Sequence, residues 1–183
     1  MRKNLLVKSV SKINKKSKKL LYKKSKKQKK VVMVSGGFDP IHIGHVRMFN
    51  EAKKLGDKLV VVINNDNWLK LKKGYAFMPE QERKEIIEAL GVVDSVVITG
   101  HSKNAKDMSV CEELCKIKPY IFANGGDRKP DWDPVPEVSI CKELGIEMVY
   151  NIGHGGKIRS SSDLVKQVQK KKFKKPARRG GKK

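Results

Sequence analysis

The chain has 183 residues, enough for one domain with a sizeable core, and its 42 lysines and arginines outnumber 19 acidic residues. The formal net charge of +23 is typical of a nucleic-acid-binding domain, but residues 1–30 hold 14 of the basic side chains, residues 166–183 hold 10, and neither end holds an acid. The 18 basic and 19 acidic residues in between nearly cancel, which excludes a uniformly basic domain, and no apolar run reaches the roughly 20 residues that span a membrane.

Residues 1–30 form a lysine-rich tail that we expect to be disordered in water. Leu6, Val10 and Ile13 fall at helical spacing between the lysines, so the tail could form a basic helix on an anionic membrane. A solvated tail with weak, nonspecific affinity for polyanions is the plainer interpretation. Organelle transit peptides are also rich in basic residues, but they favour arginine, and this tail holds only Arg2. We expect a cytoplasmic protein.

Short apolar runs alternate with helical patterns over residues 31–169, before a second basic tail over residues 170–183. Strands are expected over residues 31–34, 59–63, 94–99, 120–123 and 148–151, and helices over residues 45–55, 79–90, 110–117, 138–144 and 160–169. This alternation predicts an α/β fold, a doubly wound five-stranded parallel sheet with helices on both faces. Ligands of such sheets bind beyond the carboxyl ends of the strands, which selects the loops after the first, second, fourth and fifth strands.

A glycine- and histidine-rich turn, with the sequence SGGFDPIHIGH, follows the first expected strand. Gly36 and Gly37 let backbone N–H groups approach an anion, and a helix that begins near His45 would favour phosphate at its N-terminus. His42 and His45 could donate hydrogen bonds to charge that builds on phosphate oxygens, and Gly44 leaves room between them. A loop with two solvated histidines is the alternative.

The full turn resembles the HxGH signature, with its preceding GxFD step, of the cytidylyltransferase-like nucleotidyltransferases. The resemblance covers about residues 31–165 and implies a Rossmann-like fold. It also implies transfer of a nucleoside monophosphate from ATP or CTP to a phosphorylated sugar or alcohol, with release of pyrophosphate. Heptose-phosphate adenylyltransferases and glycerol-phosphate cytidylyltransferases are the most similar members.

Magnesium is expected with the triphosphate, held chiefly by phosphate and water. A homodimer is compatible with the resemblance. The nucleotide-binding residues that it implies in this turn are Gly36, Gly37, Phe38, Asp39 and Gly44.

Three lysines within four positions, Lys70, Lys72 and Lys73, follow the asparagine-rich turn after the second strand. Read alone, this segment is a flexible basic loop. Relatives that activate glycerol phosphate have a similar K-x-K-K-x-Y segment, whose lysines contact substrate and nucleotide phosphates. Lysine suits this task because it is a mobile point charge. The resemblance therefore assigns Lys70 and Lys72, together with His42 and His45, as the catalytic residues.

Arg83, in the helix expected over residues 79–90, matches an E-x-x-R step of the family. It could orient the lysine segment or reach a phosphate, in a supporting role. A surface salt bridge is an equally good interpretation.

The fourth expected strand is followed by NGGDR. Its glycines could let the backbone meet a base or ribose, while Asp127 accepts a hydrogen bond from a hydroxyl or amine. A simple turn is the alternative. The resemblance makes Gly126 and Asp127 nucleotide-binding residues. Their GGD form is more similar to the heptose-phosphate adenylyltransferases than to the GDD or GED of the cytidylyltransferases, which slightly favours ATP.

The segment GHGGKIRSSSDL resembles the family's R-T-x-G-I-S-T-T, in which hydroxyls at a helix N-terminus hold the triphosphate. The family's arginine would fall at Gly155, so its charge comes from Lys157 or Arg159 or is absent. A plain helix cap by one serine is the alternative. The nucleotide-binding residues implied at the S-T-T positions are Ser160, Ser161 and Ser162.

Cys111, Cys115 and Cys141 form no close-set framework, and we expect them to be reduced thiols that pack as small apolar residues. A zinc site would need further ligands, and His101 is the one other candidate, so no metal is predicted there. A second hypothesis is a catalytically silent protein that keeps the fold and binds RNA or anionic membranes through its tails. Charged and hydroxyl residues in four separate loops argue against it.

Overall fold

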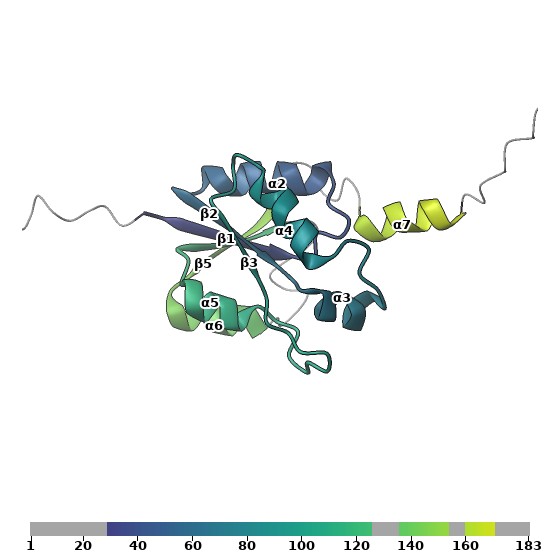
Figure 1. Cartoon of the computed structure of the whole chain (residues 1–183). Coiled ribbons are helices and arrows are strands. Elements are labelled where there is room, and N and C mark those ends of the chain that lie inside the picture. Colours follow the sequence, from purple (N-terminus) through teal and green to yellow (C-terminus); the bar gives the residue numbers. More distant parts are fainter. Residues whose placement is uncertain (1–28, 126–135, 154–159, 171–183) are drawn as a thin grey trace, which may run out of the picture.

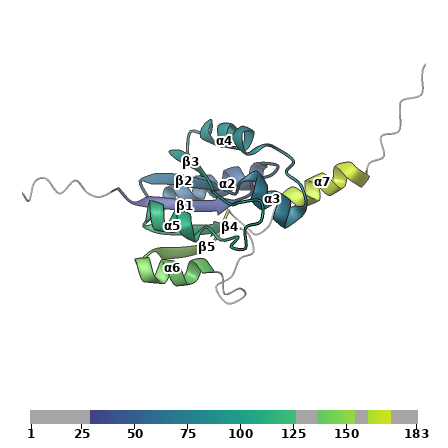
Figure 2. The same ribbon diagram turned by 60° about the horizontal axis from the view of Figure 1, so that its bottom comes forward.

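Five strands in the described part of the chain form one parallel sheet, seen edge-on in Figure 1 and turned by 60° in Figure 2. This computed structural model describes residues 29–125, 136–153 and 160–170. The strands are β1 (Val31–Gly36), β2 (Lys58–Ile63), β3 (Ser95–Ile98), β4 (Ile121–Gly125) and β5 (Glu147–Ile152), and their order is β3-β2-β1-β4-β5. The predicted fold class is confirmed. Because the strand order reverses beside β1, the carboxyl end of β1 is the expected binding position.

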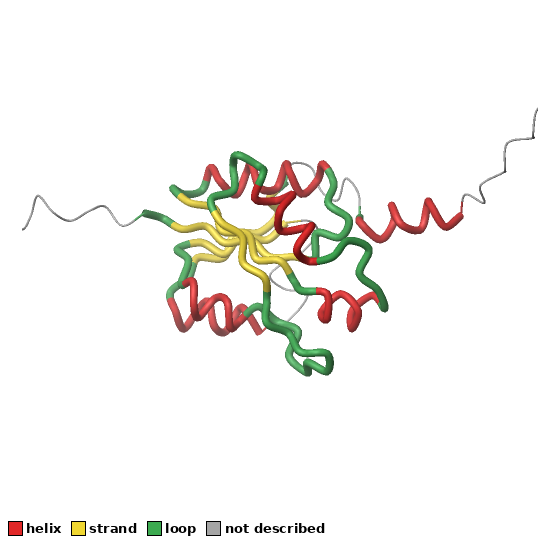
Figure 3. Tube along the Cα trace, viewed as in Figure 1, coloured by secondary structure: helices red, strands yellow, loops and turns green. Residues whose placement is uncertain are grey.

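Helices cover both faces of the sheet, as Figures 1 and 3 show. One face carries α2 (Ile43–Lys54) and α4 (Glu80–Glu88), and the other carries α5 (Cys111–Ile117) and α6 (Pro136–Leu144). A further helix, α3 (Asp66–Lys73), follows β2, and α7 (Ser161–Lys170) extends away from the sheet.

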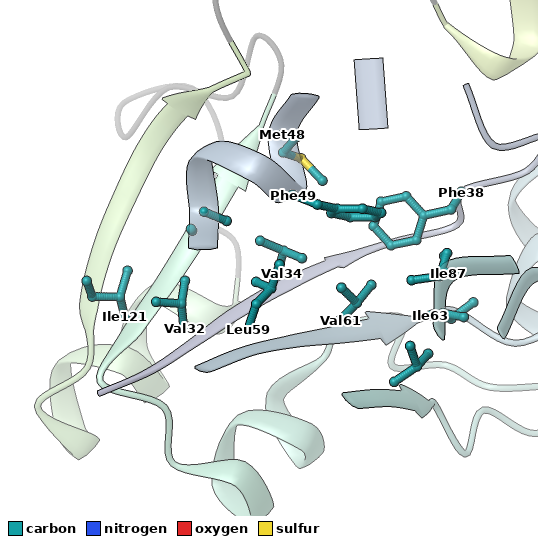
Figure 4. Packing of buried hydrophobic residues seen from close by; sticks show 13 residues of the cluster. Val32, Val34, Phe38, Met48, Phe49, Leu59, Val61, Ile63, Ile87 and Ile121 are labelled. Atoms are coloured by element: carbon teal, nitrogen blue, oxygen red, sulfur yellow. The ribbon is translucent and has the colours of Figure 1, made fainter. Parts of the chain in front are cut away.

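The alternation of side chains along each strand divides the core into two clusters. On the α2 and α4 face, Phe49 and Ile87 pack against β-strand residues (Figure 4). On the opposite face, Leu114 of α5 and Cys141 of α6 pack against a second set. The strand residues facing α2 are Val32, Val34, Leu59, Val61, Ile63, Val96, Ile121 and Ala123, and those facing α5 and α6 include Met33, Val62 and Phe122.

The predicted flexible loop after β2 is wrong, because residues 66–73 form α3. Asn65 caps this helix by accepting a hydrogen bond from Trp68 N at 2.9 Å, and Gly74 ends it with a left-handed φ of 84°. Leu69 is fully buried, and Trp68 Nε1 donates to Met108 O. These contacts fix the three lysines on a helix.

The prediction that the cysteines pack as small apolar residues holds best for Cys141, which is buried in the α5 and α6 cluster. Burial raises the pKa of its thiol to about 11. Cys111 is half-buried and Cys115 is exposed, and all three are free thiols. Within the described ranges, none of the helices is both long and apolar enough to cross a membrane. The predicted tails lie almost entirely outside the described residues.

The contacts of α3 predict unequal effects for two neighbouring asparagines. Asn65 and Asn67 both donate from Nδ2 to His101 O, but only Asn65 also caps the helix. We expect Asn65→Ala to lower the free energy of unfolding by about 1 kcal/mol more than Asn67→Ala, the usual contribution of a cap. Urea unfolding of both variants measures the difference, and equal losses would show that the cap contributes nothing.

Candidate active site

The turn after β1 is packed more tightly than a simple anion-binding loop requires. Phe38 has a φ of 48° and is buried, and its ring meets the rings of His45 and Phe49 edge-on, at centroid distances of 5.0 and 5.1 Å. A Cβ atom on Gly36 would lie 2.9 Å from this ring, and one on Gly37 would lie 2.9 Å from Leu69 of α3. The two glycines therefore make room for protein side chains. Phe38, which the sequence predicts to bind nucleotide, has a buried ring that packs against His45.

The two histidines form one hydrogen-bonded unit at the start of α2. The helix begins at Ile43, earlier than predicted, with His42 as its N-cap. His42 Nδ1 accepts a hydrogen bond from Gly44 N at 3.1 Å, and His45 Nδ1 accepts one from His42 N at 3.2 Å. The rings stack with a centroid distance of 3.7 Å. A Cβ atom on Gly44 would lie 3.0 Å from the His42 ring, so Gly44 makes this packing possible.

These bonds set the protonation of both rings. Because each Nδ1 accepts a backbone N–H, a neutral ring must carry its proton on Nε2. Burial lowers the pKa of His45 to about 3, and the electrostatic effects of His42 and Lys73 act in the same direction. His45 is therefore a neutral Nε2–H donor at physiological pH, not a cation.

Asp39 connects the turn to the segment between α3 and α4 through hydrogen bonds. Its side chain is buried, and its two carboxylate oxygens accept hydrogen bonds from Phe77 N and Met78 N, each at 2.7 Å. Asp39 was expected among the nucleotide-binding residues. The hydrogen bonds that its carboxylate accepts in the structure come from the protein backbone.

Arg83 of α4 is fully buried, which excludes the surface salt bridge. Its guanidinium donates to Gly37 O at 2.6 Å, Asn64 O at 2.8 Å and Met78 O at 3.0 Å, and forms an ion pair with Asp66 at 2.7 Å. These partners belong to the turn after β1, the end of β2, the segment before α4 and the start of α3. The contacts favour the expected role in orienting the lysine segment.

Of the three lysines on α3, Lys73 forms a hydrogen bond with the turn, although the sequence interpretation did not select it. Its Nζ donates to Asp39 O at 3.3 Å, and burial, aided by Arg83 and opposed by Asp39, lowers its pKa. Lys70 and Lys72 are exposed on α3. Had the segment been interpreted as a helix, the spacing of four from the apolar Leu69 would have placed Lys73 on the inward side.

The serine run adjoins the same turn. Ser160 Oγ accepts a hydrogen bond from Asp163 N at 3.0 Å, which caps α7, and Ser161 Oγ donates to Pro40 O at 2.9 Å. Ser162 is half-buried. The N-terminus of α7 therefore lies beside the histidine turn, 121 positions earlier in the chain. The other predicted binding residues, which lie outside the described residues, are Gly126, Asp127, Lys157 and Arg159.

Together these groups suit an anion at the carboxyl end of β1. Two histidine donors, the Lys73 ammonium and the N-termini of α2 and α7 gather there, and each favours negative charge.

Comparisons with known proteins agree with this geometry. The family described as Cytidylyltransferase-like matches residues 33–168. The bifunctional protein HldE of Hydrogenovibrio crunogenus is 38% identical over 124 residues, 62% of this chain but 25% of its own length. The FAD synthase of Methanobrevibacter smithii is 34% identical over 149 residues, 79% of this chain and 94% of its own. The chain thus spans about a quarter of the HldE proteins.

Among solved structures, a lipopolysaccharide core biosynthesis protein from Thermoplasma volcanium superimposes with a TM-score of 0.57 at 29% identity, over 69% of this chain and 99% of its own. Thermotoga maritima TmcAL, solved with alpha-thio ATP, shares the fold with a TM-score of 0.57 at 12% identity, over 76% of this chain and 50% of its own. On the sequence match, supported by the fold and the histidine turn, the chain belongs to the cytidylyltransferase-like family.

Proposed function

We propose that the protein transfers a nucleoside monophosphate, preferably AMP, from the triphosphate to a phosphorylated sugar or alcohol and releases pyrophosphate. The observation that carries the proposal is the stacked pair of histidines, whose Nδ1 atoms are both occupied by backbone N–H groups, beside Lys73. The preference for AMP rests on the GGD sequence after β4 and on the FAD synthases among the relatives, whose named product contains adenine.

In this reaction an oxygen of the acceptor phosphate attacks the α-phosphorus in line. A new P–O bond forms, the bond from the α-phosphorus to the bridging oxygen breaks, and the electron pair leaves with pyrophosphate. The protein forms no covalent bond, so it must position two anions and stabilise the charge that develops between them.

Residues in different parts of the site contact different phosphate groups. His42 and His45 donate hydrogen bonds from Nε2–H to the α-phosphate and to the departing oxygen. Lys73 supplies a charge beside the turn, and Lys70 and Lys72 supply mobile charges from the exposed side of α3. The serine run and the N-terminus of α7 would hold the remaining phosphates.

A divalent cation would enter this site bound to the phosphates of the nucleotide. The carboxylates of Asp39 and Asp66 are already bonded to backbone N–H groups and to Arg83, so they are not available as ligands. Mg²⁺ would therefore be bound through triphosphate oxygens and water, and would neutralise part of their charge.

The activity is tested by pyrophosphate release from ATP and CTP over a panel of sugar phosphates, polyol phosphates and FMN. The proposal expects at least one acceptor to give turnover, faster with ATP than with CTP. Hydrolysis of the triphosphate without any acceptor-dependent product would contradict it.

Lys73 and the two exposed lysines should behave differently. We expect Lys73→Ala to lower kcat/KM by at least tenfold, because its ammonium lies against the turn that holds the histidines. Lys70→Ala and Lys72→Ala should raise KM for the acceptor with a smaller change in kcat. Lys84→Ala, on α4 and paired with Glu88, is the control and should match the wild type. Equal kinetics for Lys73→Ala and Lys84→Ala would remove Lys73 from the site.

The protonation of His45 predicts a pH dependence of both its spectrum and the stability. Imidazole ¹⁵N shifts should show a neutral ring with the proton on Nε2 at pH 5. The pKa is about 3 in the folded state and near 6.5 in the unfolded state, so the unfolded chain binds the extra proton between these values. His45 therefore makes the folded state less stable as pH falls from 6.5 toward 3, and His45→Gln should flatten that decline. A protonated His45 ring at pH 5 would disprove this assignment.

A further inference from the structure

Three polar residues lie beyond the apolar core on the α5 and α6 side of the sheet, at the carboxyl ends of β1, β2 and β4. Met33, Val62 and Phe122, from β1, β2 and β4, belong to the cluster on that side. The residues two positions after these three are Ser35, Asn64 and Asn124, respectively. Because side chains alternate along a strand, these three point to the same side as those apolar residues. Met33 pairs with Phe122, so Asn124 is level with Ser35, whereas Ser35 pairs with Val62, so Asn64 lies two residues further toward the carboxyl end of the sheet.

The neighbouring glycines support this orientation. A Cβ atom on Gly36 would meet Phe38, and one on Gly125 would meet Met48, and both of these side chains belong to the opposite cluster. The residues just before them, Ser35 and Asn124, therefore face α5 and α6. The irregularity between β4 and β5 adds its extra residue to β5, so the alternation of β4 is kept.

Both asparagines are buried without full hydrogen bonding. Asn64 and Asn124 are each 6% exposed, and Asn64 Oδ1 and Asn124 Nδ2 have no hydrogen-bond partner in the part of the chain that is described. A buried polar atom without a partner costs about 1–3 kcal/mol. By contrast, Asn65 is 7% exposed and uses both ends of its amide within the protein. The two unpartnered amides are therefore groups that a bound molecule could satisfy.

Backbone hydrogen bonds connect Asn64 to the turn that holds the histidines. Asn64 N donates to Gly36 O at 2.9 Å, and Asn64 O accepts from Arg83 Nη1, the atom that also holds Gly37 O.

We propose that Asn64, Asn124 and Ser35 bind hydroxyl groups of the acceptor, which is a phosphate ester carrying several hydroxyls along its carbon chain. This inference rests on the proposed function. A hydroxyl both donates and accepts, so it satisfies either end of an amide, whichever way the amide is turned. Adjacent strands lie about 5 Å apart, so Asn64 and Asn124, which are two strands apart and offset by two residues along the strands, are separated by roughly 12 Å. That span fits a polyol or sugar phosphate better than a three-carbon ester.

The test measures acceptor binding separately from turnover. The full chain is saturated with α,β-methylene ATP, and calorimetry then gives affinities for a six-carbon polyol phosphate and for hexyl phosphate, which has the same length without hydroxyls. The wild type should bind the polyol phosphate at least tenfold more tightly. Asn64→Leu and Asn124→Leu should each lose about tenfold for the polyol phosphate, the scale of one lost hydrogen bond to a substrate hydroxyl, and almost nothing for hexyl phosphate.

Thermal unfolding distinguishes a binding role from a structural one. Leucine has the same number of side-chain heavy atoms and the same branching as asparagine and leaves no unpartnered polar atom, so Asn64→Leu and Asn124→Leu should keep or raise Tm. Asn65→Leu is the matched comparison and should lower Tm, because it removes a cap and a buried hydrogen bond.

The inference is overturned if the wild type binds both esters equally, a result that needs no variant to fold. It is also overturned if the leucine variants keep the wild-type preference. Selective polyol phosphate binding without pyrophosphate release, in contrast, would uphold this inference and refute the proposed function.

Discussion

The buried guanidinium of Arg83 is the interaction on which the site depends. A charge this deep is tolerated only when its donors are satisfied, and here three carbonyls and the Asp66 carboxylate accept from it. Its partners come from four separate segments, so a single side chain sets the distance between the ends of β1 and β2, the start of α3 and the segment before α4. Removing one partner of such a buried pair typically costs about 3–5 kcal/mol.

Several residues of the signature sequence make contacts within the protein that hold the histidine turn in place. Phe38 packs against His45, Asp39 holds two backbone N–H groups, and Gly44 makes room for the His42 ring. The consequence is a pair of rings whose Nδ1 atoms are fixed before any substrate binds. Preorganised donors of this kind need no rearrangement as charge develops, which is where electrostatic stabilisation is most effective.

The sequence predicted the sheet, five of the six helices and the position of the histidine turn, because apolar periodicity and glycine placement are local signals. It failed where the decisive partners are distant. The burial of Arg83 depends on carbonyls up to 46 positions away, and Lys73 differs from Lys70 only once α3 is recognised. The cap at Asn65 and the stop at Gly74 were readable signals for that helix, but its three lysines favoured a loop interpretation.

Imidazole ¹⁵N spectra and kcat of Arg83→Lys test most directly whether this buried contact positions the histidines. Lysine keeps the charge but cannot reach all four acceptors, so the turn should lose its fixed geometry while the sheet remains folded. The account predicts a folded protein by circular dichroism, altered Nδ1 and Nε2 shifts for His42 and His45, and a kcat lower by about 10², the effect of a displacement near 1 Å. Unchanged histidine shifts together with wild-type kcat in a folded variant would contradict it.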